Sequence, residues 1–271
     1  ARDFLPQIRQ PLLVDNLLVK EAVLKICSGL TKKLLIADML AKYVDMVHEF
    51  PEGFSGLEHF FSMYAYTFQI YFDFSGYSDM AVGISLLFGI RLPINFYSPY
   101  RAHNIVEFWR RWHITLSTFL RDYLYIPLGG NRSGFRLHVR NILLVFLISG
   151  LWHGAGWTFV AWGALHGLYL VTHLSWTNMI RWLGLRPSGR VWSAFAWCLT
   201  MAAVMFAWVF FRSPDMASAL RMSKAMLGVD GIAIPHRWAA MVSEFPLASE
   251  IFSGVQMPNP AMGWFWLSIH L

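Results

Sequence analysis

The sequence has 271 residues, of which 56% are hydrophobic and 14% are charged, and its formal net charge is +6. The charged fraction is well below the roughly 25% of ordinary soluble domains, which indicates an integral membrane protein. The basic residues are spread over short segments between apolar runs, as in membrane proteins generally, so their excess does not favour nucleic-acid binding. Two cysteines, Cys27 and Cys198, are too few for a disulfide framework or a thiolate metal site.

The first predicted elements lie in residues 12–47, where apolar clusters alternate with charged side chains. This pattern predicts one or two amphipathic helices at the membrane interface or packed against a helical bundle. The Pro-Glu-Gly sequence at 51–53 is a turn signal that ends the pattern. Because the chain begins at Ala1 rather than at Met and shows no signal-peptide pattern, we expect a fragment of a longer protein.

Two acidic residues, Asp73 and Asp79, lie between the apolar runs 59–72 and 80–90. Carboxylates beside apolar helices face lipid only at high cost, so they are expected to face a polar interior or the contact between two helices. The other interpretation is that they cap helix N-termini. We favour the cap for Asp79 and leave both interpretations open for Asp73.

A stiff loop with two prolines at 91–100 precedes the next predicted helix. Asn104 followed by Glu107 resembles a capping box, and the helix that it starts carries Trp109, Trp112 and His113 within about one turn of each other. Its arginines, which are Arg110, Arg111 and Arg121, make it too charged for mid-bilayer, so we expect it at the interface or lining a polar funnel. An amphipathic surface helix with arginines at lipid phosphates is the alternative. A turn at 125–131 closes the segment.

Residues 142–180 contain no Asp, Glu, Lys or Arg, yet they include His153. The run is too long for one membrane span and predicts two helical spans that join near Gly150, Gly154 and Gly156. A titratable side chain at this depth is functional by default. The alternatives are a histidine that packs between helices, or one in an aromatic belt with neighbouring tryptophans.

Two further histidines, His166 and His173, are seven residues apart and share a helix face. No Cys, Asp or Glu accompanies them, so no metal site is predicted. Residues 191–211 are uncharged and long enough to cross a membrane alone. We expect four to six membrane helices in total, and in 228–271 a tail of loops with one short helix.

Several motifs together resemble one family. They are FWRRWHITLS at 108–117, LGGNR at 128–132, SGLWHGA at 149–155, YFDFSGYSDMA at 71–81 and FAWVFFR at 206–212. The combination is similar to the membrane-bound O-acyltransferase family, and within it to the bacterial branch that includes the membrane subunit of alginate O-acetyltransferase. The resemblance covers roughly residues 10–225.

The resemblance implies an all-α, multi-pass integral membrane fold in the bacterial inner membrane, of which this sequence is a fragment lacking the N-terminal helices. Residues 1–271 would form a single, partial acyltransferase domain, with 228–271 weakly assigned to it. It implies that His153 is catalytic and that His113 is the second histidine of the site. The residues expected to line a funnel or contact substrate are Arg110, Arg111, Trp112, Trp152 and Asp73.

The implied reaction moves an acetyl group toward hydroxyls of an exported polysaccharide, most simply alginate. Relatives act on peptidoglycan or cellulose, or transfer D-alanine to teichoic acid. The donor would be a thioester co-substrate, either acetyl-CoA or an acyl carrier, with no tightly bound cofactor and no metal. His153 would take the hydroxyl proton or orient the thioester carbonyl. The expected partners are the lipid membrane, the polysaccharide and a periplasmic or extracellular acetyltransferase, and transfer either directly or through that partner stays open.

Two other classes of protein remain as alternatives. In a glycan or proton transporter, His153, Asp73 and Asp79 would relay protons without any covalent step. Transporters usually show paired repeats with broken helices in matching positions, and this sequence shows none. A scaffold for an acetylation complex would leave the buried histidines without a role.

Overall fold

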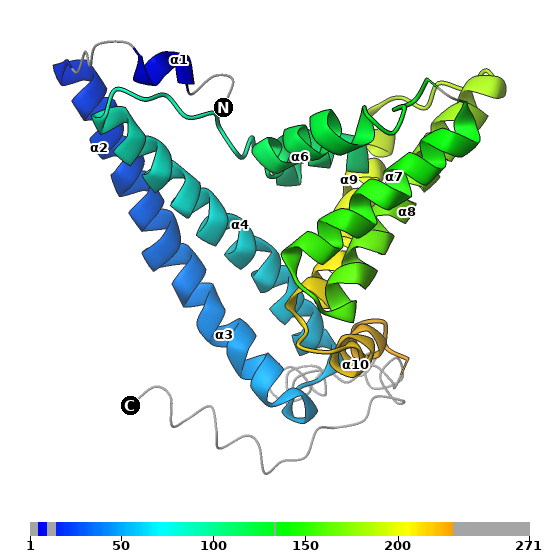
Figure 1. The fold of residues 1–271 in the computed structure, drawn as a ribbon. Helices are drawn as coiled ribbons and strands as arrows, with labels where there is room; N and C mark the ends of the chain where they lie inside the picture. Colours follow the sequence, from blue (N-terminus) through cyan, green and yellow to red (C-terminus); the bar gives the residue numbers. More distant parts are fainter. Residues whose placement is uncertain (1–4, 10–14, 133, 230–271) are drawn as a thin grey trace.

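The structure is a computed structural model that describes residues 5–9, 15–132 and 134–229. All regular secondary structure in these ranges is helical, which confirms the predicted all-α class for them. Figure 1 shows two arms of helices in a V, with α2, α3 and α4 in one arm and α7, α8 and α9 in the other. The arms meet beside α10, and the segment with α5 and α6 lies between them at the wide end, whereas α1 (Leu5–Ile8) is a single short turn.

The outer rod of the first arm consists of α2 (Asn16–Leu30), a π-helical stretch at Thr31–Ala37 and α3 (Asp38–Glu49). Its N-terminus is capped by Asp15, whose carboxylate accepts the backbone N–H of Leu18 at 2.7 Å. The rod ends at the short 3-10 turn Pro51–Gly53. The predicted amphipathic helices and the turn after them are therefore confirmed.

The inner helix of this arm, α4 (Gly56–Leu87), begins with a capping box formed by Ser55 and Glu58. It runs without interruption through both apolar runs, so Asp79 lies inside the helix and the predicted N-cap is wrong. The Asp79 carboxylate instead pairs with Lys32 at 2.6 Å and Lys25 at 3.4 Å, both from the facing rod. The two lysines compensate the negative charge of Asp79, so the carboxylate does not need the free backbone N–H groups of a helix N-terminus.

Asp73 lies two turns earlier on α4 and pairs with Lys33 at 2.6 Å, and the same lysine also reaches Asp38 at 2.8 Å. The charge of Asp73 is thus satisfied where two helices meet, which is one of the two positions that the sequence left open. Together with the Asp79 pairs, these contacts connect the two long helices of the arm.

Small residues bring the same two helices into backbone contact. A Cβ atom at Gly29 would lie 2.5 Å from the carbonyl oxygen of Gly76, and one at Gly83 would lie 2.7 Å from that of Ala22. Close approach through small residues is the usual way in which helices associate where lipid, rather than water, surrounds them.

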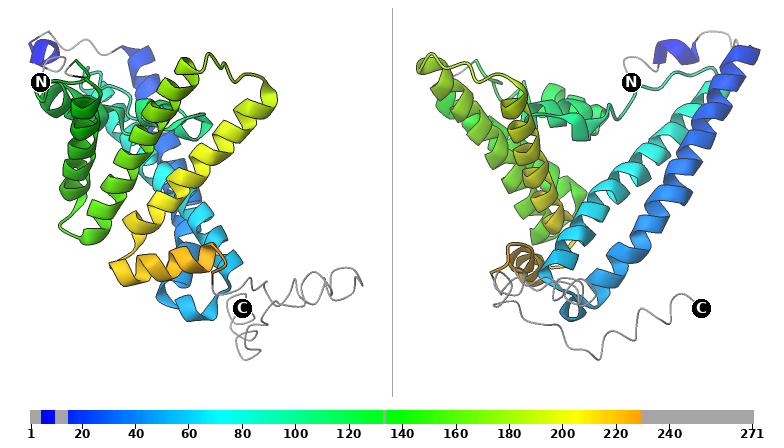
Figure 2. Two further views of the ribbon diagram at one scale, coloured as in Figure 1. Left: turned by 90° about the vertical axis from the view of Figure 1, so that its right-hand side faces the viewer. Right: turned by 180° about the vertical axis from the view of Figure 1, so that it is seen from behind.

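The second arm is built on an antiparallel pair, α7 (Phe135–His153) and α8 (Trp157–Trp182), joined at residues 154–156. A Cβ at Gly150 would strike the backbone of Phe159, so the two helices touch directly. The structure confirms two helices that join at the glycines, but of this pair only α7 is long and apolar enough to count as a candidate membrane span. Helix α9 (Arg190–Arg212) packs on α8, as the two views in Figure 2 show.

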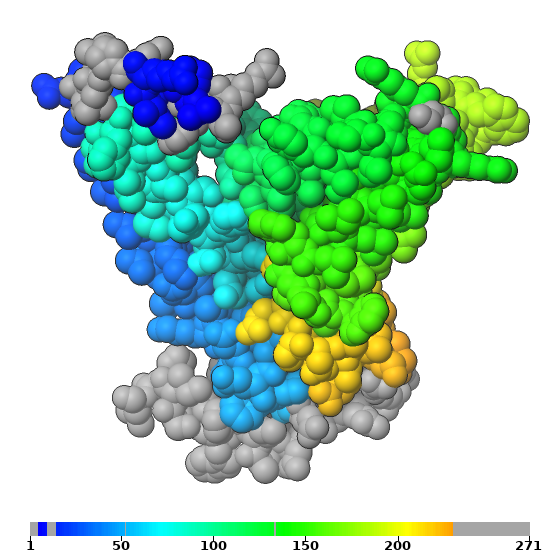
Figure 3. Space-filling model, in the orientation of Figure 1, coloured from blue at the N-terminus to red at the C-terminus, as the bar shows by residue number. Residues whose placement is uncertain are grey.

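The arms are joined by α10 (Met216–Met226), which contacts α4 and α9. Its N-cap is Asp215, whose pKa is held below its usual range by the hydrogen bond from the Ser218 backbone N–H. The space-filling view shows side chains occupying much of the space between the arms (Figure 3). An aromatic core of buried rings runs across this junction, and its largest fully buried side chains are Trp162, Trp208 and Phe108.

Two helices in the described part, α7 and α9, are long and apolar enough to cross a membrane. This count is below the predicted four to six, partly because the apolar runs 59–72 and 80–90 belong to one helix, α4, which also carries Asp73 and Asp79. The predicted tail falls almost entirely on residues 230–271, outside the described residues.

We predict that Gly29→Val destabilises the protein by about 1 to 3 kcal/mol, because the added carbons meet the backbone of α4. The control is Ser28→Val, which introduces the same side chain at the neighbouring, exposed position. Thermal unfolding in detergent micelles would measure both variants. Equal melting temperatures for the two would contradict the close contact of α2 with α4.

Candidate active site

The site begins at an interruption in the predicted helix of residues 104–122. The structure divides it into α5 (Ile105–Arg111) and α6 (Ile114–Leu120), so the expected single helix is wrong. The predicted start is confirmed, because the Asn104 side chain accepts the backbone N–H of Glu107 at 2.8 Å. Between the helices, His113 has φ 44° and ψ 54°, a left-handed conformation that is uncommon outside glycine.

The preceding proline loop stabilises this interruption through its backbone. The N–H of Tyr97 donates to the carbonyl of Arg111, and the N–H of Ile114 donates to the carbonyl of Asn95, both at 2.9 Å. Backbone groups that the helix cannot pair are thus paired by the loop. The sequence indicated a stiff loop here, but not that it would pair with the helix and open it.

The His113 side chain lies among residues of three segments. Its ring is 4.7 Å from that of Phe74 on α4 and 6.4 Å from that of Trp152 on α7, measured between centroids. Its Nδ1 atom lies 3.1 Å from Oδ1 of Asn95. Sequence analysis did not single out Phe74 or Asn95, although both belong to segments that it discussed.

His153 is the last residue of α7, where Gly154 ends the helix. Its ring is 4.9 Å from Trp152, 5.0 Å from Trp162 and 5.1 Å from Phe211, so α7, α8 and α9 each supply one aromatic neighbour. Within the described residues, the imidazole has ring contacts and no hydrogen bond that would fix its tautomer.

Trp152 is the residue that connects the two histidines. It is in ring contact with both His113 and His153, and 62% of it is exposed. The two histidines, which were predicted from separate motifs, therefore both lie beside the indole ring of Trp152. Two imidazoles beside an accessible aromatic surface are suited to proton transfer with a bound substrate.

The other predicted site residues lie in different surroundings. Arg111 pairs with Glu107 at 2.7 Å and its guanidinium lies 5.4 Å from the ring of Tyr97, whereas Arg110 is exposed. Trp112 is only 4% exposed and packs in the aromatic core, and Asp73 pairs with Lys33 as described above. Their predicted place in a funnel stays a prediction.

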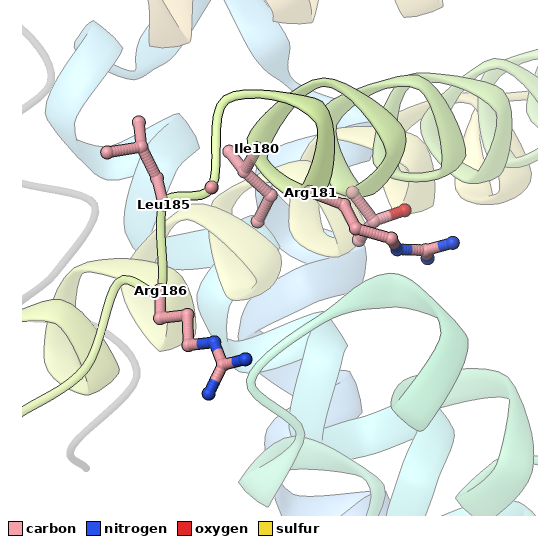
Figure 4. Close-up of a pocket in the computed structure, with 6 residues that line it drawn as sticks. Ile180, Arg181, Leu185 and Arg186 are labelled. Carbon is pink, nitrogen blue, oxygen red and sulfur yellow. The ribbon is translucent and has the colours of Figure 1, made fainter.

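His166 is fully buried on α8 and accepts a hydrogen bond from the indole N–H of Trp109 at 3.3 Å. This bond connects α5 to the α7–α8 pair, so the residue has a clear packing role. Over the described ranges, no three His, Cys, Asp or Glu side chains gather in a way that could hold a metal ion. A separate surface pocket, lined by residues that include Arg181 and Arg186, lies at the end of α8 remote from the 154–156 turn (Figure 4).

Comparison with known proteins identifies the class to which this helical chain and its paired histidines belong. The sequence pattern of the membrane-bound O-acyltransferase family matches residues 2–213. The chain belongs to the membrane-bound O-acyltransferase family.

Individual relatives agree with this assignment. The chain is 49% identical to a peptidoglycan O-acetyltransferase of Helicobacter pylori, over 77% of this chain and 39% of that protein. It is 45% identical to a probable alginate O-acetylase of Pseudomonas aeruginosa, over 76% and 38%. A teichoic acid D-alanyltransferase of Bacillus subtilis is 34% identical, over 55% and 40%. The chain thus spans about two fifths of the length of these relatives.

We predict that Gly154→Ala lowers the melting temperature more than Gly156→Ala. A Cβ at Gly154 would lie 2.5 Å from the ring of Phe159, which packs on Phe211 beside His153, whereas one at Gly156 would meet only ordinary contacts from 3.5 Å outward. Calorimetry of the purified variants in one detergent measures the difference. A larger loss for Gly156→Ala would contradict the packing of the turn.

Proposed function

We propose that this chain is the catalytic part of a multi-pass O-acyltransferase of the bacterial inner membrane, which transfers an acetyl group from a thioester to hydroxyls of an exported polysaccharide. The observation that carries the proposal is the contact of His113 and His153 with the same indole ring, Trp152. Family membership and the charge-poor composition support the membrane setting.

We infer the transferred group and the acceptor polysaccharide from the activities for which the relatives are named. The two relatives reported above at 45% identity or more are both named for O-acetyl transfer, one to peptidoglycan and one to alginate. The D-alanyltransferase is less similar and matches less of the chain. We therefore propose acetyl as the group transferred, with alginate and peptidoglycan as the two acceptors to compare.

The chemistry requires a base at the acceptor hydroxyl. In the proposed step, the His153 imidazole takes the hydroxyl proton while the oxygen attacks the thioester carbonyl carbon. The carbon–sulfur bond then breaks, and the departing sulfur takes the proton from the imidazolium. The products are an ester and a free thiol, so protons and charges balance. Proton transfer of this kind typically contributes about 10² to 10⁴ in rate.

Among the other predicted site residues, Arg110 is assigned a role on the basis of its charge. Arg110 is exposed and has no ion pair in the described part of the chain, so its guanidinium is available to a phosphate of the donor, acetyl-CoA or an acyl carrier. The donor enters as a co-substrate and no tightly bound cofactor is proposed. A periplasmic or extracellular acetyltransferase is the proposed protein partner.

We predict that His153→Gln in the full-length protein lowers acetyl transfer by about 10² or more, and that His113→Gln also lowers it. His173→Gln, a partly buried histidine on α8 outside the site, is the control. Vesicles bearing each variant at equal expression would receive labelled acetyl-CoA, or a D-alanyl carrier in a parallel arm, with the purified partner and glycan.

Three outcomes are distinguishable in this assay. Loss of label from the glycan in the two site variants but not in the control supports the proposal. Undiminished transfer by His153→Gln would rule out its role as the base. Label that crosses the membrane without becoming attached to an acceptor would favour the transporter instead.

A further inference from the structure

The side chain of Asn95 lies between His113 and Thr115 and contacts both. Its Oδ1 atom is 3.1 Å from His113 Nδ1, 3.3 Å from the backbone nitrogen of Thr115 and 3.0 Å from the Thr115 hydroxyl. On its other side, the amide nitrogen donates to the Ser78 hydroxyl on α4 at 3.4 Å. One asparagine thus connects the proline loop, α4 and the start of α6.

These contacts determine which atom of the amide faces the histidine. The backbone N–H of Thr115 is only a donor, so the amide atom that it meets must be the oxygen. An oxygen accepts and cannot donate, so the His113 nitrogen that faces it must carry a proton. The bond is therefore Nδ1–H to Oδ1, and in the neutral imidazole the lone pair lies on Nε2.

In the described part of the chain, the Nε2 atom of His113 is not engaged in a hydrogen bond. It is also not completely buried, although His113 as a whole is half-buried. His166 differs in both respects. The indole N–H of Trp109 donates to its Nδ1, so the lone pair lies on Nδ1 and not on Nε2, and its Nε2 is buried. Of these two histidines, only His113 presents an Nε2 lone pair that is not completely buried.

The backbone of Asn95 contributes to the same geometry. Its carbonyl accepts the N–H of Ile114, the residue that follows the left-handed His113. The residue therefore fixes the position of the imidazole through the main chain and its tautomer through the side chain.

We propose that Asn95 is a positioning residue for acyl transfer, which holds His113 as the Nδ1–H tautomer so that its Nε2 is presented beside Trp152 as a hydrogen-bond acceptor, while His153 remains the base that takes the hydroxyl proton. This inference rests on the proposed function for its catalytic meaning, but the tautomer itself is measurable without activity. The other tautomer would place an N–H at that position and could not accept a hydrogen bond there.

The test uses the full-length protein in lipid nanodiscs with Asn95→Leu, which removes the acceptor at similar size, and Asn95→Asp, which keeps it. Asn178→Leu is the matched control, because Asn178 is exposed on α8 and has no side-chain hydrogen bond in the described part. Nitrogen NMR of protein labelled at histidine reports which ring nitrogen carries the proton, with His113→Gln identifying the signal. Acetyl transfer is measured as kcat and KM separately.

We expect a protonated Nδ1 on His113 in the wild type, in Asn95→Asp and in the control. Asn95→Leu is expected to shift the proton toward Nε2 and to lower kcat by about tenfold or more, with a much smaller change in KM. Asn95→Asp should restore most of kcat, which a purely structural role of the amide would not require.

Two results would overturn the proposal. One is an Nε2–H tautomer in the wild type, and the other is an unchanged tautomer in a folded Asn95→Leu. If Asn95→Leu does not fold, Asn95→Asp decides, since a folded Asp variant that keeps the tautomer but is inactive contradicts the positioning role. A wild type that holds the Nδ1–H tautomer and loses it in Asn95→Leu, but transfers no acetyl, would refute the proposed function while confirming that Asn95 holds the imidazole.

Discussion

The hydrogen bonds between the proline loop and the interruption at His113 are the constraint on which the candidate site depends. A helix that stops inside a membrane protein leaves backbone N–H and C=O groups that must find other partners. Asn95 and Tyr97 pair with the backbone on either side of Trp112 and His113, so the loop supplies partners for the carbonyl of Arg111 and the N–H of Ile114 at the turn. The same turn places Trp112 in the core and leaves His113 half-buried.

The second half of the site rests on close helix packing rather than on hydrogen bonds. Glycines bring the backbones of α7 and α8 together, and Gly154 ends α7 directly after His153. The imidazole is then held by aromatic rings from three helices. One histidine is therefore oriented by a polar network and the other by apolar contacts, and they meet at Trp152. Such a difference in environment is how proteins give two identical side chains different roles.

The all-α class and the positions of most helices could be predicted from the sequence, because apolar periodicity is a local signal. The roles of His113 and His153 stay predictions that rest on the motifs around them. Sequence analysis failed for Asp79, whose partners Lys25 and Lys32 lie about fifty residues away, on a different helix. It also failed at His113, where nothing local ends the helix and the interruption comes from a loop that pairs with it. Asn95 could not be singled out for the same reason, since its importance lies in contacts with Thr115 and Ser78 that only the folded chain reveals.

The central claim is that His113 and His153 share one site at Trp152, in a member of the membrane-bound O-acyltransferase family. A high-resolution cryo-electron microscopy map of the full-length protein in lipid nanodiscs tests it most directly. We expect a helix interrupted at His113, with Asn95 Oδ1 within hydrogen-bond distance of its Nδ1 and the Trp152 ring in contact with both imidazoles. A continuous helix through residues 104–122, or two histidines separated by an intervening helix, would contradict it.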